Sequence, residues 1–253
     1  MEYMDSNSSY ILTDLRAFRV FTLRSNCGRL VSFFALQMNK THFLLGILLS
    51  GVNIFLILTI APQNQLQADF GNIFYIHVPV AWTAFIGYLF VMVFSILFLW
   101  KREQIWDHYA LASAEAGTLF MFLVLLTGPI WAKPAWGHFW VWEPRLTTSL
   151  ILFLIFLGYF MLREFGGNPE QVSRYAAVLG IIAFIDVPII FLSVKLWLPE
   201  LQSHPQVGQY FINAGIMPSL MINYSLLSLL VIISFMIRFR VHILKRLEER
   251  NII

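Results

Sequence analysis

The chain has 253 residues, of which 58% are hydrophobic and only 12% charged, with a mean hydropathy of +0.72 and a formal net charge of +3. A soluble domain carries about 25% charged residues, so this chain has too few to cover a water-facing surface, and we expect an integral membrane protein. The single cysteine, Cys27, excludes a disulfide framework, a cysteine-based zinc site and an iron–sulfur cluster held by this chain alone, and the lack of a Gly-rich phosphate loop excludes nucleotide hydrolysis.

Residues 1–40 precede the first long apolar segment and mix basic with apolar side chains. Leu15 to Gln37 combines Arg with Phe, Leu and Val, as an amphipathic helix at a membrane interface would. The alternative is a true start at Met38, which would open the first span cleanly. Both interpretations stay open, and we treat 1–40 as a basic extension and 41–250 as the membrane domain.

Six segments are apolar enough to cross a membrane as helices, which need about 20 mostly apolar residues. They cover residues 43–61, 73–100, 109–131, 146–162, 175–197 and 210–237. Their apolar character on all sides favours helices, because barrel strands would alternate with a period of two. The predicted fold is therefore an all-α integral membrane protein with six transmembrane helices.

Lys and Arg are distributed unevenly between the two sides of these spans. Fourteen of the 17 fall on the side of the two termini, and only Lys133, Arg145 and Lys195 fall on the other. An excess of Lys and Arg marks the cytoplasmic side. Both termini are therefore expected in the cytoplasm, and the loop at 131–147 on the outer face.

A tryptophan-rich run, WGHFWVWEPRLT, occupies this predicted outer loop. It holds three tryptophans, an acid and a base: Trp136, Trp140, Trp142, Glu143 and Arg145. A flat, mostly apolar ligand could lie against such a surface. The alternative is an ordinary interfacial belt, which explains Trp82 and Trp100 well but three tryptophans within seven residues less well.

Two histidines fall on separate outer segments. His77 lies at the entrance of the second span, where Pro79 fits the first turn of a helix, so its side chain is expected at the membrane surface, facing the outer loops. His204 lies between the last two spans. The two imidazoles could approach a metal from opposite sides, or each could be solvated without a role. His138, inside the Trp-rich run, is expected to be an exposed residue at its rim.

Glu115 and Asp186 lie inside the predicted third and fifth spans. Ionisable residues within a membrane are functional candidates by default. The sequence places no cationic partner for them within the spans. They are either packed, hydrogen-bonded groups or parts of a polar route across the bilayer.

The pattern Trp-Gly-x-x-Trp-x-Trp, closed by an acid, Arg145 and Leu146, resembles the signature of the cytochrome c assembly family, whose members handle haem outside energy-transducing membranes. By size and number of spans the chain is similar to the haem exporter C branch of that family, over about Met38 to Arg250. The stretch Tyr75-Ile-His77-Val-Pro79 shares the likeness.

The resemblance implies that haem b is bound transiently on the outer side. The residues implied to contact it are Trp136, Gly137, Trp140, Trp142, Glu143 and Arg145, with His77 and His204 as axial ligands of the iron. The sequence departs from the family pattern at two of these residues: Glu143 replaces the family's Asp, and about three extra residues precede His204. Arg145 or Lys133 could pair with the haem propionates, or simply balance charge at the interface.

The resemblance also implies the partners and the place of action. Haem would pass to a membrane-anchored haem chaperone, with ABC transporter subunits and a small single-span protein as associates, in a bacterial inner membrane or a mitochondrial one. We expect contacts with lipid, no nucleic-acid partner, and no enzymatic activity, because no nucleophile–base pair is present. A permease subunit and an electron-transfer cytochrome b are the alternatives; the second is disfavoured because no histidine falls in the middle of a span.

Overall fold

The computed structural model describes residues 41, 43–59, 71–196 and 216–250, which are helical apart from short links. The helices are Phe43–Thr59, α2 (Gly71–Lys101), α3 (Gln104–Trp136), α4 (Pro144–Phe165), α5 (Pro169–Phe184), α6 (Asp186–Leu196) and α8 (Ile216–Glu249). The all-α prediction is confirmed. The N-terminal extension and its two interpretations lie outside the described residues.

Five helical stretches are long and apolar enough to span a membrane: Ile73–Lys101, Gln104–Pro134, Pro144–Phe165, Pro169–Ser193 and Ile216–Glu249. The apolar helix Phe43–Thr59, at the first predicted span, is shorter. The count of six spans and the cytoplasmic termini therefore stay predictions, whereas membrane integration follows from the five long helices.

The fifth predicted span is divided in two. α5 ends at Phe184 and α6 begins at Asp186, with Ile185 in a turn between them. Pro188 explains the break, because proline lacks the N–H that would bond to the carbonyl of Phe184. The division places the acid of this span at the start of a new helix.

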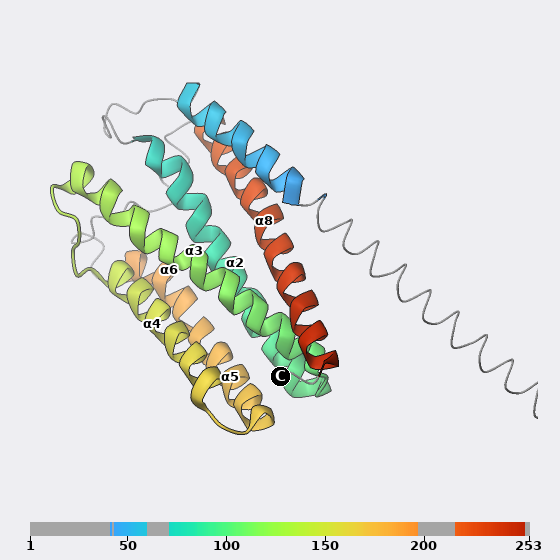
Figure 1. The fold of residues 1–253 in the computed structure, drawn as a ribbon. Helices are drawn as coiled ribbons and strands as arrows, with labels where there is room; N and C mark the ends of the chain where they lie inside the picture. The colour runs from blue at the N-terminus through green and yellow to red at the C-terminus, as the bar shows by residue number, and fades with distance from the viewer. Residues whose placement is uncertain (1–40, 42, 60–70, 197–215, 251–253) are drawn as a thin grey trace, which may run out of the picture. The chain divides into compact units, whose positions relative to one another are not determined.

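α2 and α3 form the centre of the bundle (Figure 1). α8 packs against both of them, and α4, α5 and α6 lie on their other side. α2 and α3 meet closely at two glycines: a Cβ on Gly87 would lie 2.8 Å from the Cα of Gly117. Small residues at such crossings let helix backbones approach each other in membranes. Nearby, the buried ring of Tyr88 stacks on Phe156 of α4, with 4.0 Å between centroids.

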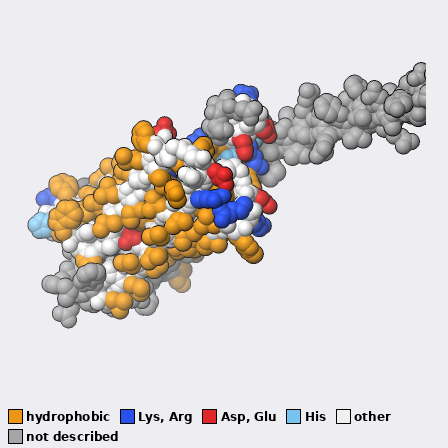
Figure 2. Space-filling view, turned by 90° about the horizontal axis from the view of Figure 1, so that it is seen from below, with side chains coloured by type: hydrophobic (Ala, Val, Ile, Leu, Met, Phe, Trp, Pro, Cys, Tyr) orange, Lys and Arg blue, Asp and Glu red, His pale blue; other side chains and the backbone are white. Residues whose placement is uncertain are grey.

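Apolar side chains cover much of the molecule's surface (Figure 2). Leu58 is 70% exposed, Leu44 64% and Met161 62%. Such a surface is expected where the surroundings are lipid tails. Since lipid tails are as apolar as Leu side chains, packing and polar contacts decide which helix faces meet.

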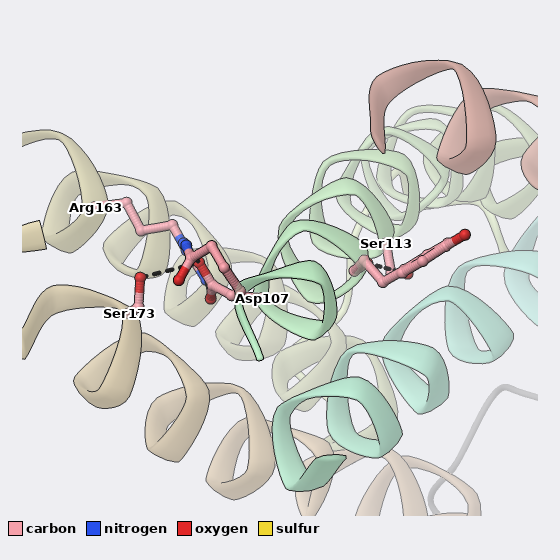
Figure 3. Close-up of polar contacts among 6 residues, drawn as sticks. Asp107, Ser113, Arg163 and Ser173 are labelled. Carbon is pink, nitrogen blue, oxygen red and sulfur yellow. Dashed lines mark hydrogen bonds and ion pairs between the residues drawn. The ribbon is translucent and has the colours of Figure 1, made fainter. Parts of the chain in front are cut away.

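A buried polar cluster joins three helices at one end of the bundle (Figure 3). Asp107 of α3 accepts two hydrogen bonds from Arg163 of α4, at 2.5 and 3.0 Å, and a third from the hydroxyl of Ser173 of α5 at 2.9 Å. The guanidinium also lies 4.8 Å from the ring centroid of Tyr159. Three hydrogen bonds compensate the cost of burying this ion pair and fix how the three helix ends meet.

Candidate functional site

A pocket opens between α2, α3, α4 and α6, at the end of the bundle where α3 ends and α4 begins. Its empty space totals about 1060 Å³, a figure that includes the part open to solvent. Four residues singled out from the sequence line it: His77 of α2, Trp136 of α3, Trp140 of the link after α3, and Arg145 of α4. Residues distant in the sequence thus share one cavity.

Seven of the 19 residues that line the pocket are Phe or Trp. The ring of Trp136 meets buried Trp131 edge-on, at 4.9 Å between centroids, and Trp131 lies 6.5 Å from Phe74. On the α6 side, Phe191 lies 5.1 Å from both Trp82 and Phe85. Trp82, which the sequence assigns to the interfacial belt, therefore also lines the pocket. The result is an apolar space between rings, suited to a flat ligand.

A glycine turn joins α3 to the Trp-rich link, which contributes Trp140 to the pocket wall. Gly137 follows α3 with φ +81°, and its N–H bonds to the carbonyl of Lys133 at 2.9 Å. This left-handed conformation is the usual glycine C-cap and ends the helix after Trp136. The link ends at Pro144, the first residue of α4, where a missing N–H costs nothing. The two ends of the link thus place Trp136 and Trp140 on the same cavity.

His77 lies inside α2, nearly two turns after its start at Gly71. The expectation that Pro79 occupies the first turn is wrong, because α2 begins earlier and Pro79 is interior to it. As a consequence His77 faces α3 and the pocket, whereas the sequence suggested that it faces the outer loops. Its Nδ1 lies 2.8 Å from the hydroxyl oxygen of Thr127 on α3.

Arg145 is the only charged side chain among the described residues that line the pocket. It is half-buried, and its guanidinium carbon lies 5.9 Å from the ring centroid of Phe191. Lys133, the other cation considered from the sequence, does not line the cavity. Its ammonium donates to the carbonyl of Gly137 at 2.9 Å and lies 5.3 Å from the ring of Phe139. Lys133 therefore supports the turn, and Arg145 is the cation available to an anionic ligand.

The remaining residues of the run surround the pocket. Trp142 is 74% exposed and meets Trp140 edge-on at 5.7 Å, and His138 is exposed, as predicted. Glu143 is buried at the N-terminal boundary of α4, where its carbonyl accepts from the N–H of Thr147 at 3.0 Å. A negative charge is stabilised at this end of a helix. The geometry gives Glu143 a part in shaping the link.

His204 lies outside the described residues, so a second axial ligand is untested. Within the described part of the chain, three or more His, Cys, Asp or Glu side chains do not gather as a metal site would require. A metal bound by His77 in this pocket would therefore take its other ligands from residues outside the described ranges or from a cofactor that contains the metal.

The two acids within the spans differ in their surroundings. Glu115 accepts from Arg240 of α8 at 2.6 and 2.8 Å, so the expectation that it has no cationic partner is wrong. The error arises because α8 continues to Glu249, which brings Arg240 alongside α3. Asp186 begins α6 and has one buried carboxylate oxygen without a hydrogen-bond partner among the described residues. Neither acid lines the pocket.

Thr127, Trp131 and Phe191 are site residues that reading the sequence did not single out. A usable signal exists for α2: Phe74, His77, Ala81 and Phe85 share one helix face at spacings of three and four. The facing residues on α3 and α6 carry no comparable signal, because these helices are apolar all round.

Comparison with known proteins identifies relatives over most of the chain. A family model described as "Heme exporter protein C" matches residues 22–253. The "Heme exporter protein C" of Bradyrhizobium diazoefficiens is 40% identical over 138 residues, 54% of this chain and 52% of the relative. That of Haemophilus influenzae is 36% identical over 173 residues, 68% and 66% of the two chains. A "Putative cytochrome c biosynthesis ccmC-like mitochondrial protein" of Arabidopsis thaliana is 32% identical over 203 residues, 79% and 77%.

The match covers only part of some relatives: about half of the Bradyrhizobium protein and 63% of a ccmC-like mitochondrial protein of Marchantia polymorpha. The match to the family model begins at residue 22, before Met38.

Proposed function

The chain belongs to the haem exporter protein C family, and on this premise we propose that it binds haem b in the pocket between α2, α3, α4 and α6 and delivers it to a membrane-anchored haem chaperone during cytochrome c maturation. ABC transporter subunits and a small single-span protein in the same membrane are the proposed associates. The observation that carries the proposal is that His77 and the Trp-rich link share one cavity.

The residues of the pocket fit a haem in three respects. A haem has a flat apolar ring, an iron that accepts imidazole nitrogen, and two carboxylates. The pocket offers aromatic walls, the imidazole of His77 and the guanidinium of Arg145. The pocket therefore matches each part of a haem, because apolar surface, a metal ligand and a cation occur together in it.

Each pocket residue has a distinct proposed task. Trp136 and Trp140 cover the ring, and aromatic contacts of this kind add about 0.5–1.5 kcal/mol each beyond area burial. Arg145 binds a propionate, since guanidinium donates two parallel hydrogen bonds to a carboxylate. His77 is the proposed first axial ligand and His204 the second.

The other motif residues act on the shape of the site. Gly137 supplies the turn, and Glu143 occupies the start of α4 beside Arg145, with which it interacts electrostatically. Trp142 is exposed next to Trp140 and is available to extend the aromatic surface over a bound haem. An open site with an exposed rim favours release, which a delivery protein requires.

Absorption spectroscopy of the purified protein tests the proposal. The protein is isolated in mild detergent from haem-replete cells, alone and with its chaperone trapped on it, and haem is measured as the pyridine haemochrome. We expect a haem spectrum for the wild type, loss or a shift of the spectrum in His77→Ala and His204→Ala, and no change in His138→Ala. A colourless wild-type preparation, even with the chaperone trapped, would contradict haem binding.

The permease alternative has its own test. If haem crossed the bilayer through this chain, polar residues inside the spans would control delivery. We expect Asp186→Asn and Glu115→Gln to leave delivery to the chaperone intact, because neither residue lines the pocket. Loss of delivery with an unchanged haem spectrum would favour a permease.

A further inference from the structure

His77 contacts a polar side chain of the neighbouring helix α3. Its ring Nδ1 lies 2.8 Å from Oγ1 of Thr127, which joins α2 to α3 at the wall of the pocket. The two residues are separated by 50 positions in the sequence, so the contact is a product of helix packing. Its meaning depends on which of the two groups donates the hydrogen.

The position of the Thr127 hydroxyl proton follows from its other neighbours. Oγ1 lies 2.7 Å from the carbonyl oxygen of Leu123 and 3.5 Å from that of Val124, both one turn earlier on α3. Carbonyl oxygens only accept, and two oxygens at 2.7 Å would repel each other without a proton between them. The single hydroxyl proton is therefore directed to Leu123. Oγ1 therefore faces His77 with a lone pair and acts as the hydrogen-bond acceptor.

The ring nitrogen that faces Thr127 must then carry a proton. A neutral imidazole has one N–H and one nitrogen with a lone pair, and only the latter binds a metal. With the proton on Nδ1, the lone pair is on Nε2. Histidines that bind metals usually donate their other N–H to a nearby acceptor, which fixes both the tautomer and the orientation of the ring.

We propose that Thr127 is a positioning residue, which holds His77 as the Nδ1–H tautomer and presents the lone pair of Nε2 to the iron of haem. The inference rests on the proposed function for its ligand, but the tautomer itself is a property of the haem-free protein. Thr127 does not touch the iron. It acts through the imidazole.

Nitrogen-15 NMR of the haem-free protein tests the tautomer directly. The protein is labelled at histidine, purified in detergent from haem-deficient cells, and the His77 signals are identified by their loss in His77→Ala. Protonated and unprotonated ring nitrogens differ strongly in chemical shift. We expect a protonated Nδ1 and an unprotonated Nε2, and a mixture of tautomers in Thr127→Val, which has nearly the same shape but no acceptor.

Two variants isolate the contact. Thr127→Ser retains the hydroxyl and should restore the wild-type tautomer. Thr83→Val on α2 removes a buried hydroxyl that also bonds one turn back, to the carbonyl of Pro79 at 2.8 Å, and should leave His77 unchanged. An unprotonated Nδ1 in the wild type, or the same tautomer in Thr127→Val as in the wild type, would overturn the proposal.

Haem titration supplies the second measurement and separates the two proposals. Loss of an orienting partner typically weakens metal binding 10- to 100-fold, so we expect Thr127→Val to weaken haem binding by about that factor, with a shifted Soret band, and Thr127→Ser to bind nearly as the wild type. An affinity in Thr127→Val within twofold of the wild type would overturn the role of Thr127. A wild-type haem spectrum in His77→Ala would overturn the role of His77 as axial ligand, and a colourless wild type would overturn the proposed function, while the NMR result on the haem-free protein would stand in both cases.

Discussion

Gly137 separates the two tryptophans that line the pocket, and its backbone conformation decides where the second one lies. Its φ of +81° is in the left-handed region, although a Cβ at this position would meet open space. A substitution is therefore opposed by backbone strain and not by crowding. The position of Trp136 is set by α3, whereas the position of Trp140 depends on the turn at Gly137.

Gly137→Ala should reduce stability by roughly 1–2 kcal/mol, the cost of placing an L-residue in the left-handed region, and should lower haem retention because Trp140 moves. Thermal unfolding in detergent and the haem content of the purified protein measure the two effects. Gly158→Ala is the matched control, since Gly158 is helical and also faces open space. Equal behaviour of the two variants would contradict the role given to the turn.

Arg145 provides the second residue-level prediction. Arg145→Gln should weaken haem binding several-fold without removing the axial ligand, so the shape of the spectrum persists while saturation needs more haem. Lys133→Gln should not weaken it comparably, because the Lys133 ammonium is used on the Gly137 carbonyl outside the pocket. Haem titration followed at the Soret band measures both. Similar losses in the two variants would indicate that general positive charge, and not a guanidinium in the pocket, attracts the propionates.

At the level of helices, the cluster of Asp107, Arg163 and Ser173 fixes the end of the bundle opposite to the pocket. The Arg163 side chain is 12% exposed and that of Asp107 4%, so water compensates neither charge well and the two charges compensate each other. Removing one member of a buried pair leaves the other uncompensated, which is more costly than the pair is favourable.

Asp107→Ala should lower the free energy of unfolding by about 3–5 kcal/mol, the usual cost of stranding a buried charge. Haem bound by the surviving folded fraction should have a wild-type spectrum, because the cluster shares no residue with the pocket. Glu170→Gln removes an ion pair with Arg174 whose side chains are 74% and 47% exposed, and should have little effect. Thermal unfolding of the two variants measures how much more the loss of a buried ion-pair partner destabilises the protein than the loss of an exposed one.

For the whole molecule, the charge distribution and the pocket lie at opposite ends of the helices. Asp107 and Arg163 meet at one end, and His108 lies 3.8 Å from Glu248 near the end of α8, whereas α3 and α4 carry the pocket at their other ends. The excess of Lys and Arg predicts that the opposite end lies in the cytoplasm, and the pocket is then predicted to face the outside. This orientation is required if haem is to be delivered on the outer side.

Cysteine labelling tests the orientation in intact cells. In a Cys27→Ser background, His138→Cys next to the pocket should react with a membrane-impermeant thiol reagent, whereas Glu164→Cys at the other end of α4 should react only after the membrane is opened. Both positions are exposed in the structure, so a difference reports the side of the membrane. The reverse pattern would contradict delivery on the outer side.

The amino-acid sequence by itself determined the helical class and the approximate positions of the spans, and it indicated the Trp-rich run as a candidate site. These properties are local: the length and hydropathy of a segment decide whether it can cross a bilayer, and the composition of a short loop decides whether it can bind a flat ligand. The break between α5 and α6, which Pro188 explains, was not predicted from the sequence.

Tertiary structure alone decided which side chains meet. Thr127 contacts His77 across 50 residues, and Arg240 contacts Glu115 across 125. The physical reason is that a helix surrounded by lipid is apolar on all sides, so its sequence lacks the polar and apolar faces that reveal the orientation of a helix in water. The packing of α2 on α3, close enough at Gly87 and Gly117 to exclude a Cβ, brings His77 to Thr127 and the pocket.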